Sequence, residues 1–404
     1  MNKKYKIGFL VSHPIQYNTP LFKEIANHPQ IDLTVFYCSD EGIKKIMEDP
    51  GFGKMIIWDI PLLEGYKYRL LKNYSPTPSI NAGFFGLINL GIVRELRREK
   101  FDALIINEWS HLTDILSIIS ARLLGINTIM RGENPLNHEF RKSRFKVLAK
   151  RIILKYLFKI IDCFLFIGQQ NKEFYRFYGV PENKLFFAPY AVDNQRFVNA
   201  YEKLLKQRNE IRDEIGISQD EIVILFCGKL IDKKRPMDLL IAYEKVRVNN
   251  KALIYIGDGI LRKRLEDYVK AKELKNVFFL GFRNQTEFPK YYGASDIFVL
   301  PSTIGETWGL VVNEAMCFSL PVIVSDMVGC GKDLVRHGEN GFIYPVGNMD
   351  KLADYLFKLL KSSELREKMG KRSFEIISKW SYKENIEGIL LALEYISNIK
   401  TNHD

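Results

Sequence analysis

The chain has 404 residues, of which 47% are hydrophobic and 26% are charged. This composition is typical of a globular protein, and the length suits two domains better than one core. The five cysteines are scattered without a Cys-x-x-Cys pair, which argues against a disulfide framework or a zinc site and favours a reducing cytosol. The formal net charge is +11, and residues 1–196 hold 28 basic and 19 acidic side chains. This excess predicts an anionic partner for the first half of the chain.

The first half alternates short apolar runs with helical stretches. Residues 5–12 are predicted to form a first strand, because their apolar run is too short for a signal peptide. Further strands are predicted at residues 33–37, 103–107, 128–130, 164–167 and 185–188. This alternation predicts a parallel, doubly wound sheet. The uncharged residues 73–93 contain Pro76 and Pro78, so they are not expected to form a helix that spans a membrane.

Residues 141–159 contain eight cations and no acidic residue. As a helix they would carry lysines on one side (Lys142, Lys146, Lys150, Lys155 and Lys159) and apolar residues on another (Phe145, Leu148, Ile152 and Tyr156). Such a basic amphipathic helix predicts contact with an anionic membrane surface. The alternative is a helix whose outer face is simply solvated. Nucleic acid is not an expected partner, because the block has no zinc-finger, RNP or helix-turn-helix pattern.

A domain boundary is expected near residue 200, with a charged helix over residues 201–214 leading into the second domain. Strands are then predicted at residues 222–227, 253–256, 277–280 and 297–300. The first of these strands is followed by Gly228 and Lys229, and Lys234 stands five residues further on. Two lysines in this position can bracket a diphosphate as point charges. The alternative is a solvated basic turn.

The strand at residues 297–300 is followed by a loop and a helix that carry two glutamates. Glu306 falls just past the carboxyl end of the strand, where open α/β sheets bind their ligands. Gly309 and Leu310 lie in the first turn of the helix, whose N–H groups lack intrahelical partners and attract phosphates. Glu314 lies roughly 9 Å beyond the helix start. The two carboxylates can therefore grip opposite ends of one ligand, Glu314 at ribose hydroxyls and Glu306 at a sugar beyond a diphosphate.

Two glutamates at this spacing usually mark only a solvated helix face, but here they stand within an ordered set of short motifs. These are Pro301-Ser302, Trp308-Gly309-Leu310, Glu314-Ala315-Met316, Pro321-Val322-Ile323, Ser325-Asp326, Asp333-Leu334-Val335 and Asn340-Gly341. With them the chain resembles the retaining glycosyltransferases of family 4, the glycosyl transferases group 1. The resemblance implies the GT-B fold, in which two Rossmann-like, doubly wound α/β domains face a central cleft. The implied domains are residues 1–200 and 201–380, with a last helix in 381–404 returning to the first domain.

The resemblance also implies a reaction and its site. A hexosyl or related sugar would pass from a nucleotide-diphosphate sugar to a saccharide or lipid-linked acceptor. The expected setting is bacterial surface-polysaccharide or glycolipid assembly, in the cytoplasm or on the inner face of the cell membrane. The implied catalytic residues are Glu306, Lys229, Lys234 and Glu133. The implied donor-binding residues are Glu314, Gly309, Leu310, Thr307, Trp308, Arg283 and Gly257.

The loop after the first strand, His13-Pro14-Ile15-Gln16-Tyr17, looks like an opening seen in members of the family that assemble polysaccharides. It would place His13, Gln16 and Tyr17 on the acceptor side, and the alternative is that His13 and Gln16 only tie down a turn. No Asp-x-Asp occurs in the chain. We therefore expect neither a metal ion nor another cofactor at the site.

The chain departs from the family pattern at three positions. Lys229 stands where an arginine is usual, which keeps the charge and loses the bidentate fork. Glu133 stands near the place of a histidine beside the reacting sugar. Ser319 replaces a glycine that ends a helix, which predicts a strained left-handed residue.

Two other functions stay open. One is a GT-B sugar-nucleotide epimerase, which would need no acceptor. The other is a non-catalytic module that binds membrane or polyanion through the basic helix.

Overall fold

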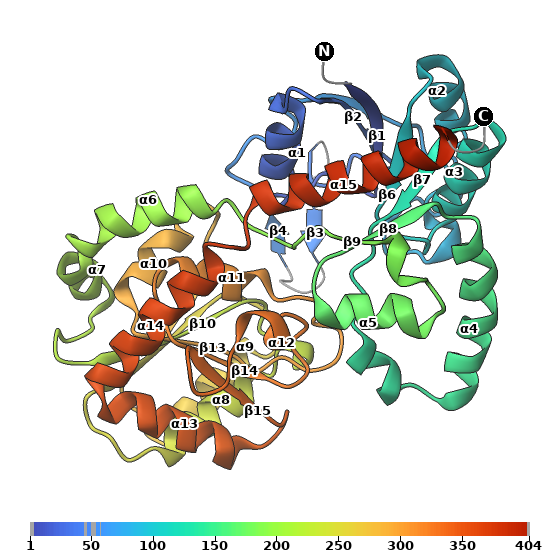
Figure 1. Ribbon diagram of the computed structural model, residues 1–404. Helices are drawn as coiled ribbons and strands as arrows, with labels where there is room; N and C mark the ends of the chain where they lie inside the picture. The colour runs from blue at the N-terminus through green and yellow to red at the C-terminus, as the bar shows by residue number, and fades with distance from the viewer. Residues whose placement is uncertain (1–3, 44–46, 50–53, 57, 402–404) are drawn as a thin grey trace. The chain divides into compact units, whose positions relative to one another are not determined.

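The computed structural model describes residues 4–43, 47–49, 54–56 and 58–401 (Figure 1). The chain divides into two compact units. The first unit holds residues 1–47, 60–190 and 382–404, and the second holds residues 48–59 and 191–381. The chain thus passes from the first unit to the second after residue 190, somewhat earlier than the boundary near residue 200 that the sequence predicts. The reason is that Asp193 caps a helix that already belongs to the second unit.

The first unit is built on a seven-stranded parallel sheet. In sheet order its strands are β5 (Lys67–Leu70), β2 (Ile31–Tyr37), β1 (Tyr5–Val11), β6 (Ala103–Ile106), β7 (Asn127–Met130), β8 (Cys163–Phe166) and β9 (Leu185–Phe187). Strand β6 is buried throughout and forms a continuous apolar run, as parallel strands covered on both faces do. Every strand expected in this half is present. Strand β5 was not expected, because this charged edge strand is mostly exposed.

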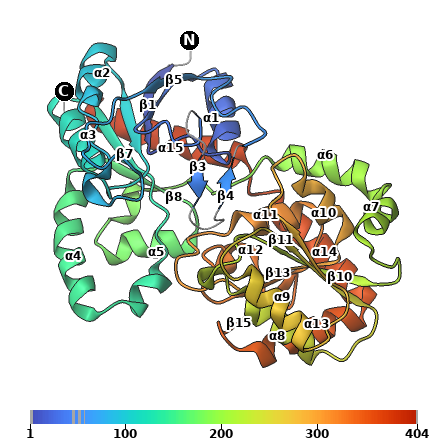
Figure 2. The ribbon, with the colours of Figure 1, turned by 180° about the vertical axis from the view of Figure 1, so that it is seen from behind.

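Helices cover both faces of this sheet. They are α1 (Asn18–Asn27), α2 (Gly91–Glu99), α3 (Leu112–Leu123), α4 (Arg144–Lys159), α5 (Gln169–Phe177) and α15 (Tyr382–Thr401), with short 3₁₀ turns at Phe84–Gly86, Leu136–Arg141 and Glu182–Lys184. Side chains of α1 and α15 share one core cluster with the sheet, and side chains of α2 to α5 share another. Helix α15 crosses the sheet in the foreground of Figure 1 and lies behind it in Figure 2. Its Ile389 and Leu393 are fully buried.

The second unit is built on a six-stranded parallel sheet. In sheet order its strands are β12 (Val277–Gly281), β11 (Lys251–Ile256), β10 (Ile222–Cys227), β13 (Ile297–Leu300), β14 (Val322–Ser325) and β15 (Gly341–Tyr344). A separate pair, β3 (Met47–Asp49) and β4 (Lys54–Ile56), falls largely in this unit. The helices are α6 (Asn194–Leu205), α7 (Arg208–Ile215), α8 (Pro236–Lys245), α9 (Arg262–Ala271), α10 (Phe288–Ala294), α11 (Leu310–Cys317), α12 (Gly331–Leu334), α13 (Met349–Lys361) and α14 (Ser363–Ile377), with a 3₁₀ turn at Asp232–Lys234.

Two local expectations concern this unit. The single charged helix expected over residues 201–214 is wrong, since α6 and α7 are separate helices. Helix α6 begins at Asn194 because the Asp193 side chain accepts a hydrogen bond of 3.0 Å from Arg196 N. The strain expected at Ser319 is confirmed, because this residue follows α11 with a φ of 53°. Among the described residues, none of the helices is long and apolar enough to cross a membrane.

Candidate active site

The carboxyl edge of the second sheet brings Lys234 and Glu306 together. The chain runs from β10 outward to β11 and β12 and then returns to β13 on the other side of β10. The loops after β10 and β13 therefore lie side by side at the switch point where such sheets bind ligands. Lys234 Nζ donates to Glu306 Oε2 in an ion pair, and Glu306 is only 7% exposed. Two residues predicted from separate motifs thus form one ion pair, in which Glu306 is buried and Lys234 is half-buried.

The charges around Glu306 keep its carboxylate ionised. Burial alone would raise the pKa of Glu306, but the positive charges of Lys234 and Lys233 outweigh burial and hold the pKa below its ordinary value. Lys233 Cε lies 3.2 Å from the position that a Cβ would take at Gly305, so Lys233 lies over the loop that carries Glu306. Sequence reasoning missed Lys233, although its place directly before Lys234 was a signal.

Glycines stand at the carboxyl ends of three neighbouring strands, at Gly228, Gly257 and Gly281. Gly228 N donates to Ile256 O at 2.9 Å and Gly257 N donates to Gly281 O at 2.8 Å. Gly257 has a φ of 130°, and a Cβ there would lie 2.0 Å from Gly228 O. The strand ends therefore form a surface of bare backbone next to Lys229, which a phosphate or a flat ring can approach closely.

Gly257→Ala is expected to lower the free energy of unfolding by about 3 kcal/mol, because the new Cβ meets Gly228 O at a backbone angle that L residues avoid. Denaturation by urea measures this loss. Gly338→Ala is the matched control, since Gly338 also has a positive φ, of 84°, but among the described residues, its two chain neighbours aside, no atom lies within 4 Å of its Cβ position. Equal losses in the two variants would show that the close approach at Gly257 is not what requires glycine.

Helix α11 begins at the same edge of the sheet. Gly309 is its N-cap, with a φ of 97°, and a Cβ at Gly309 would lie 2.9 Å from Leu300 Cδ2. Glycine is therefore required both by conformation and by packing. Val312 N already donates to Gly309 O at 2.9 Å, so the first-turn donors that lack intrahelical partners are the N–H groups of Leu310 and Val311, which stand at the strand-end edge that carries Glu306.

The other predicted donor-binding residues take different positions. The Trp308 side chain points into the core, where Nε1 donates to Asn313 Oδ1 at 2.9 Å and the ring lies 5.5 Å from the ring of Trp380. Any contact of Trp308 with a donor would therefore involve its backbone. Thr307 is half-buried in the loop after β13. Arg283 follows β12, two strands away from β10.

Glu314 is buried in the second turn of α11. Tyr292 OH donates to Glu314 Oε2 at 2.7 Å. Burial raises the pKa of Glu314 to about 7, although the hydrogen bond from Tyr292 and the charge of Arg196 act in the opposite direction. The carboxyl therefore changes charge near neutral pH, and Tyr292 already occupies one of its oxygens.

Glu314→Gln is expected to exceed the native chain in stability by about 3 kcal/mol at pH 8 and by less than about 1 kcal/mol at pH 5. The pKa of Glu314 is about 7 in the folded state against an ordinary 4.5. The folded state thus keeps a proton that the unfolded state releases, and this contribution is lost as the pH rises through 7. Urea unfolding at both pH values measures the difference. Glu202→Gln, at an exposed position of α6, is the control, and a pH-independent difference for Glu314→Gln would contradict the assignment.

Three residues predicted on the acceptor side follow β1 in the first unit. Gln16 is buried, whereas His13 and Tyr17 are half-buried. Ser12 Oγ lies 3.0 Å from His13 Nδ1. Burial lowers the pKa of His13 to about 4, so its imidazole is neutral at physiological pH. Because β2 and β6 lie on opposite sides of β1, this loop stands at the switch point of the first sheet.

Glu133 follows β7 at the same edge of the first sheet. Arg131 Nη1 lies 3.6 Å from Glu133 Oε1. Burial raises the pKa of Glu133, although the charge of Arg131 and a hydrogen bond with Tyr190 act against it. Burial also raises the pKa of Glu108, which follows β6, and the charge of Glu133 adds to this shift. The structure thus gathers a polar group here, of which sequence reasoning missed Arg131 and Glu108.

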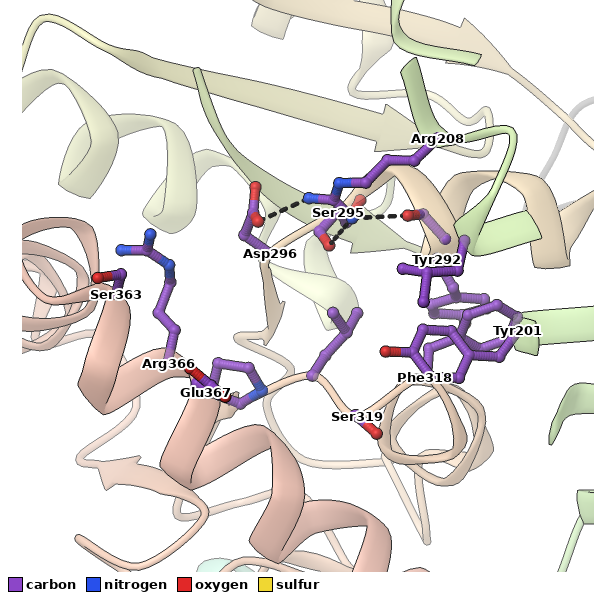
Figure 3. A pocket seen from close by; sticks show the side chains of 14 residues that line it. Tyr201, Arg208, Tyr292, Ser295, Asp296, Phe318, Ser319, Ser363, Arg366 and Glu367 are labelled. Atoms are coloured by element: carbon purple, nitrogen blue, oxygen red, sulfur yellow. Dashed lines mark hydrogen bonds and ion pairs between the residues drawn. The ribbon is translucent and has the colours of Figure 1, made fainter. Parts of the chain in front are cut away.

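A separate pocket of about 330 Å³ lies at the opposite edge of the second sheet, and Asp296 and Pro321, which precede β13 and β14, help to line it (Figure 3). Arg208, Ser295 and Asp296, three of its polar residues, are bonded to one another. Arg208 Nη2 donates to Asp296 Oδ1 at 2.6 Å, and Arg208 Nη1 donates to Ser295 O at 3.0 Å. These bonds tie α7 to the start of β13. We therefore assign this pocket to the framework of the unit rather than to the site.

Comparison with known proteins gives the class of fold and domain. Residues 207–375 match the family described as glycosyl transferases group 1. The crystal structure of Anabaena Alr3699/HepE in complex with UDP and glucose is similar to this chain with a TM-score of 0.68 at 17% identity, and the similarity covers 98% of this chain and 100% of that one. The expected fold class, GT-B with two Rossmann-like domains, is confirmed.

Two relatives are similar in sequence. The UDP-Gal:alpha-D-GlcNAc-diphosphoundecaprenol alpha-1,3-galactosyltransferase of Escherichia coli is 27% identical over 278 residues, which are 67% of this chain and 69% of the relative. The N-acetyl-alpha-D-glucosaminyl L-malate synthase of Bacillus anthracis is 30% identical over 183 residues, which are 45% of this chain and 47% of the relative. The chain thus spans about two thirds of one relative and about half of the other. Together with the matched family, these relatives support a glycosyltransferase.

Proposed function

We propose that this protein is a retaining glycosyltransferase that moves a hexosyl or related sugar from a nucleotide-diphosphate sugar to an acceptor. The observation that carries the proposal is the ion pair between half-buried Lys234 and buried Glu306 at the switch point of the second sheet. Lys229 and the first turn of α11 stand at the same edge. The matched family and the relatives support the reaction class, and the retaining outcome follows from the resemblance of the glutamate motif.

The reaction requires that negative charge growing on the departing diphosphate be stabilised. Lys234 and Lys229 would supply two positive charges, and the first-turn N–H groups of α11 would supply oriented dipoles. These groups balance the diphosphate charge without a metal ion. Glu306 would accept hydrogen bonds from hydroxyls of the transferred sugar, and Glu314 would accept them from the ribose. Each role is a proposal for a side chain that the fold places at or near this edge.

The comparisons favour a particular donor and a particular kind of acceptor. The Alr3699/HepE structure holds UDP and glucose, and the E. coli relative is named for transfer from UDP-Gal to a GlcNAc-diphosphoundecaprenol. For this chain we therefore propose a UDP-sugar and a lipid-linked saccharide. This pairing would serve assembly of a cell-surface polysaccharide or glycolipid at the inner face of a membrane.

Helix α4 supports a location at a membrane surface. The four apolar residues predicted to gather on one side of the helix are exposed; they are Phe145, Leu148, Ile152 and Tyr156. Ile153, which was not predicted, is exposed as well. Leu154 and Phe158 are buried and anchor the helix to the first unit. A helix that presents both cations and a row of apolar side chains suits the interface of an anionic bilayer better than open water.

The predicted basic face of this helix needs one correction. Lys142 and Lys150 both donate to Glu139 Oε1, at 2.6 and 3.0 Å, and Lys150 also lies over the ring of Phe174. Their charges are therefore directed to an internal partner. Lys146, Lys155 and Lys159 are exposed, so they belong to the outer surface together with Arg144 and Arg151.

Nucleotide release from a panel of UDP-, GDP- and ADP-sugars, with a chelator present, tests the proposed function. We expect release from one donor, insensitive to the chelator and lost in Glu306→Gln. Such a result would name the donor and support a transferase that needs no metal. If no donor binds and no nucleotide is released, the proposal is contradicted. Such a result would favour a non-catalytic module that binds a membrane.

A further inference from the structure

Among the residues that the structure describes, Arg131 is the largest fully buried side chain, at 1% exposure. It follows β7, and its backbone N donates to Ile106 O at 2.8 Å, which extends the β6–β7 ladder by one residue. The sheet itself therefore holds Arg131 in place. Arginine is rarely buried unless its guanidinium is paired, so each nitrogen of this group has to be accounted for.

The guanidinium of Arg131 is only partly satisfied. Nη1 lies 3.6 Å from Glu133 Oε1, and Cζ lies 5.0 Å from the ring centre of Tyr190. In the part of the chain that the structure describes, Nε and Nη2 have no hydrogen-bond partner. These two nitrogens form one edge of the guanidinium, a fork whose two N–H bonds match the two oxygens of a carboxylate or a phosphoryl group.

Asn107 is the neighbour of Arg131 on the adjacent strand, and its side-chain oxygen also lacks a partner among the described residues. Ile106 and Met130 are paired in the register of β6 and β7, so Asn107 and Arg131 are the next residues on adjacent strands. Within the described residues, Asn107 Oδ1 is buried without a hydrogen-bond donor. Buried polar groups without partners cost stability. A ligand that supplies an anion to the fork and a hydroxyl to Asn107 would complete both groups.

We infer that Arg131 binds a two-oxygen anionic group, a carboxylate or a phosphoryl, on the substrate held by the first unit, with Asn107 Oδ1 accepting from a neighbouring hydroxyl. The inference rests on the proposed function, because the acceptor is expected on this unit. Glu133 lies at Nη1, on the other edge of the guanidinium, so it orients the fork without covering it. Because the Arg131 side chain is almost completely buried, its fork suits a small charged group on a narrow stem better than the face of a sugar ring.

The charges at this edge of the sheet favour a carboxylate over a phosphoryl group as the ligand of Arg131. Glu133 and Glu108 follow neighbouring strands and interact electrostatically. Their carboxyl groups disfavour a second negative charge close by. A sugar carboxylate, with one charge, therefore fits this edge better than a phosphate monoester with two.

The test follows the Nε–H resonance of Arg131 by ¹⁵N NMR in the full chain, titrated with glucuronate, inorganic phosphate or glucose. Loss of the resonance in Arg131→Lys assigns it. Glucuronate is expected to shift the resonance at lower concentration than phosphate, and neutral glucose is expected to leave it unchanged. A stronger response to phosphate would support the same fork with a phosphoryl group as its ligand. No response to either anion, or an equal response to glucose, would overturn the inference.

Two variants test the fork itself by calorimetric titration with glucuronate. Arg131→Lys keeps the charge but loses the fork, and it should weaken binding at least about tenfold. Asn107→Asp, which places a negative charge beside the fork, should also weaken binding. Arg122→Lys, at an exposed position of α3, should bind as the native chain does. Native affinity in Arg131→Lys would overturn the inference.

Release of nucleotide from the donor sugar, measured on the same proteins, separates this inference from the proposed function. The donor is expected to bind the second unit, so Arg131→Lys should keep the native affinity for UDP. A native chain that releases nucleotide but does not respond to anions would overturn only the inference. A chain that responds to anions but releases nucleotide from no donor would overturn only the proposed function.

Discussion

Lys234→Ala is expected to slow sugar transfer by about 10²- to 10³-fold and to weaken nucleotide binding, because it removes one of the two charges proposed to stabilise the departing diphosphate. It also leaves Glu306 buried without its ion-pair partner. A buried charge left in this way costs about 3 kcal/mol or more of stability. Transfer is measured by nucleotide release and stability by urea unfolding, so that the rate is read only where the variant is fully folded.

Glu306→Gln separates the two effects of that change. It keeps the volume of the side chain and frees Lys234 from its partner, so nucleotide affinity should be retained or increased while transfer falls. Lys263→Ala is the control, since Lys263 forms an exposed ion pair with Asp267 in the same unit. Near-native transfer in either Lys234→Ala or Glu306→Gln would remove the pair from the site. If nucleotide affinity falls by the same factor in Lys234→Ala and in Glu306→Gln, the separate roles proposed for the two residues are contradicted.

A triple change of exposed apolar residues in α4, Phe145→Ser, Ile152→Ser and Tyr156→Ser, should release the protein from anionic vesicles. Three side chains that enter the interface should contribute at least about 3 kcal/mol together, so binding should weaken by about 100-fold or more. Co-sedimentation with phosphatidylglycerol vesicles measures this loss. The change spares Leu154 and Phe158, which hold the helix to the unit, and is therefore expected to leave the fold intact.

Leu123→Ser is the control for that experiment, because Leu123 on α3 is similarly exposed. It should leave vesicle binding unchanged. A second variant, Lys146→Glu with Lys155→Glu, should weaken binding to phosphatidylglycerol and abolish its advantage over phosphatidylcholine. Lys150 is left out of this variant because it bonds to Glu139. Unchanged sedimentation of the triple apolar variant would refute the membrane proposal.

The part of the site that sequence reasoning found depends on a rule of topology. Buried parallel strands are recognised in a sequence as apolar runs. The residues that follow β10 and β13 could therefore be predicted as candidate site residues. The rule that ligands meet such sheets at the switch point then predicts that Lys234 and Glu306 belong to one site. The structure brings these two into contact. The sequence predicted no order of strands, so the family resemblance joined the two motifs, and the observed place of β13 beside β10 explains why their loops are neighbours.

The residues that sequence reasoning misplaced depend on contacts that have no local pattern. Helical spacing assigned Lys150 to the outer face, but Glu139, from the turn before the helix, directs it inward. Trp308 sits within a recognised motif, yet Trp380 and Asn313 hold its side chain in the core. Arg131 directly follows a strand that the sequence predicts, but the burial of its guanidinium becomes visible only when the neighbouring strand ends are assembled.

The position of α15 sets an order of events during synthesis. The first unit receives part of its core from Ile389 and Leu393. The rest of that unit, however, has been synthesised once the ribosome reaches about residue 190. At typical speeds of translation α15 follows roughly 10 to 40 s later. Throughout this interval one face of the sheet lacks its final helix, so the half that begins first is completed last. A ribosome that stops within the second unit would therefore leave both halves unfinished, and the exposed apolar face would mark the fragment for removal.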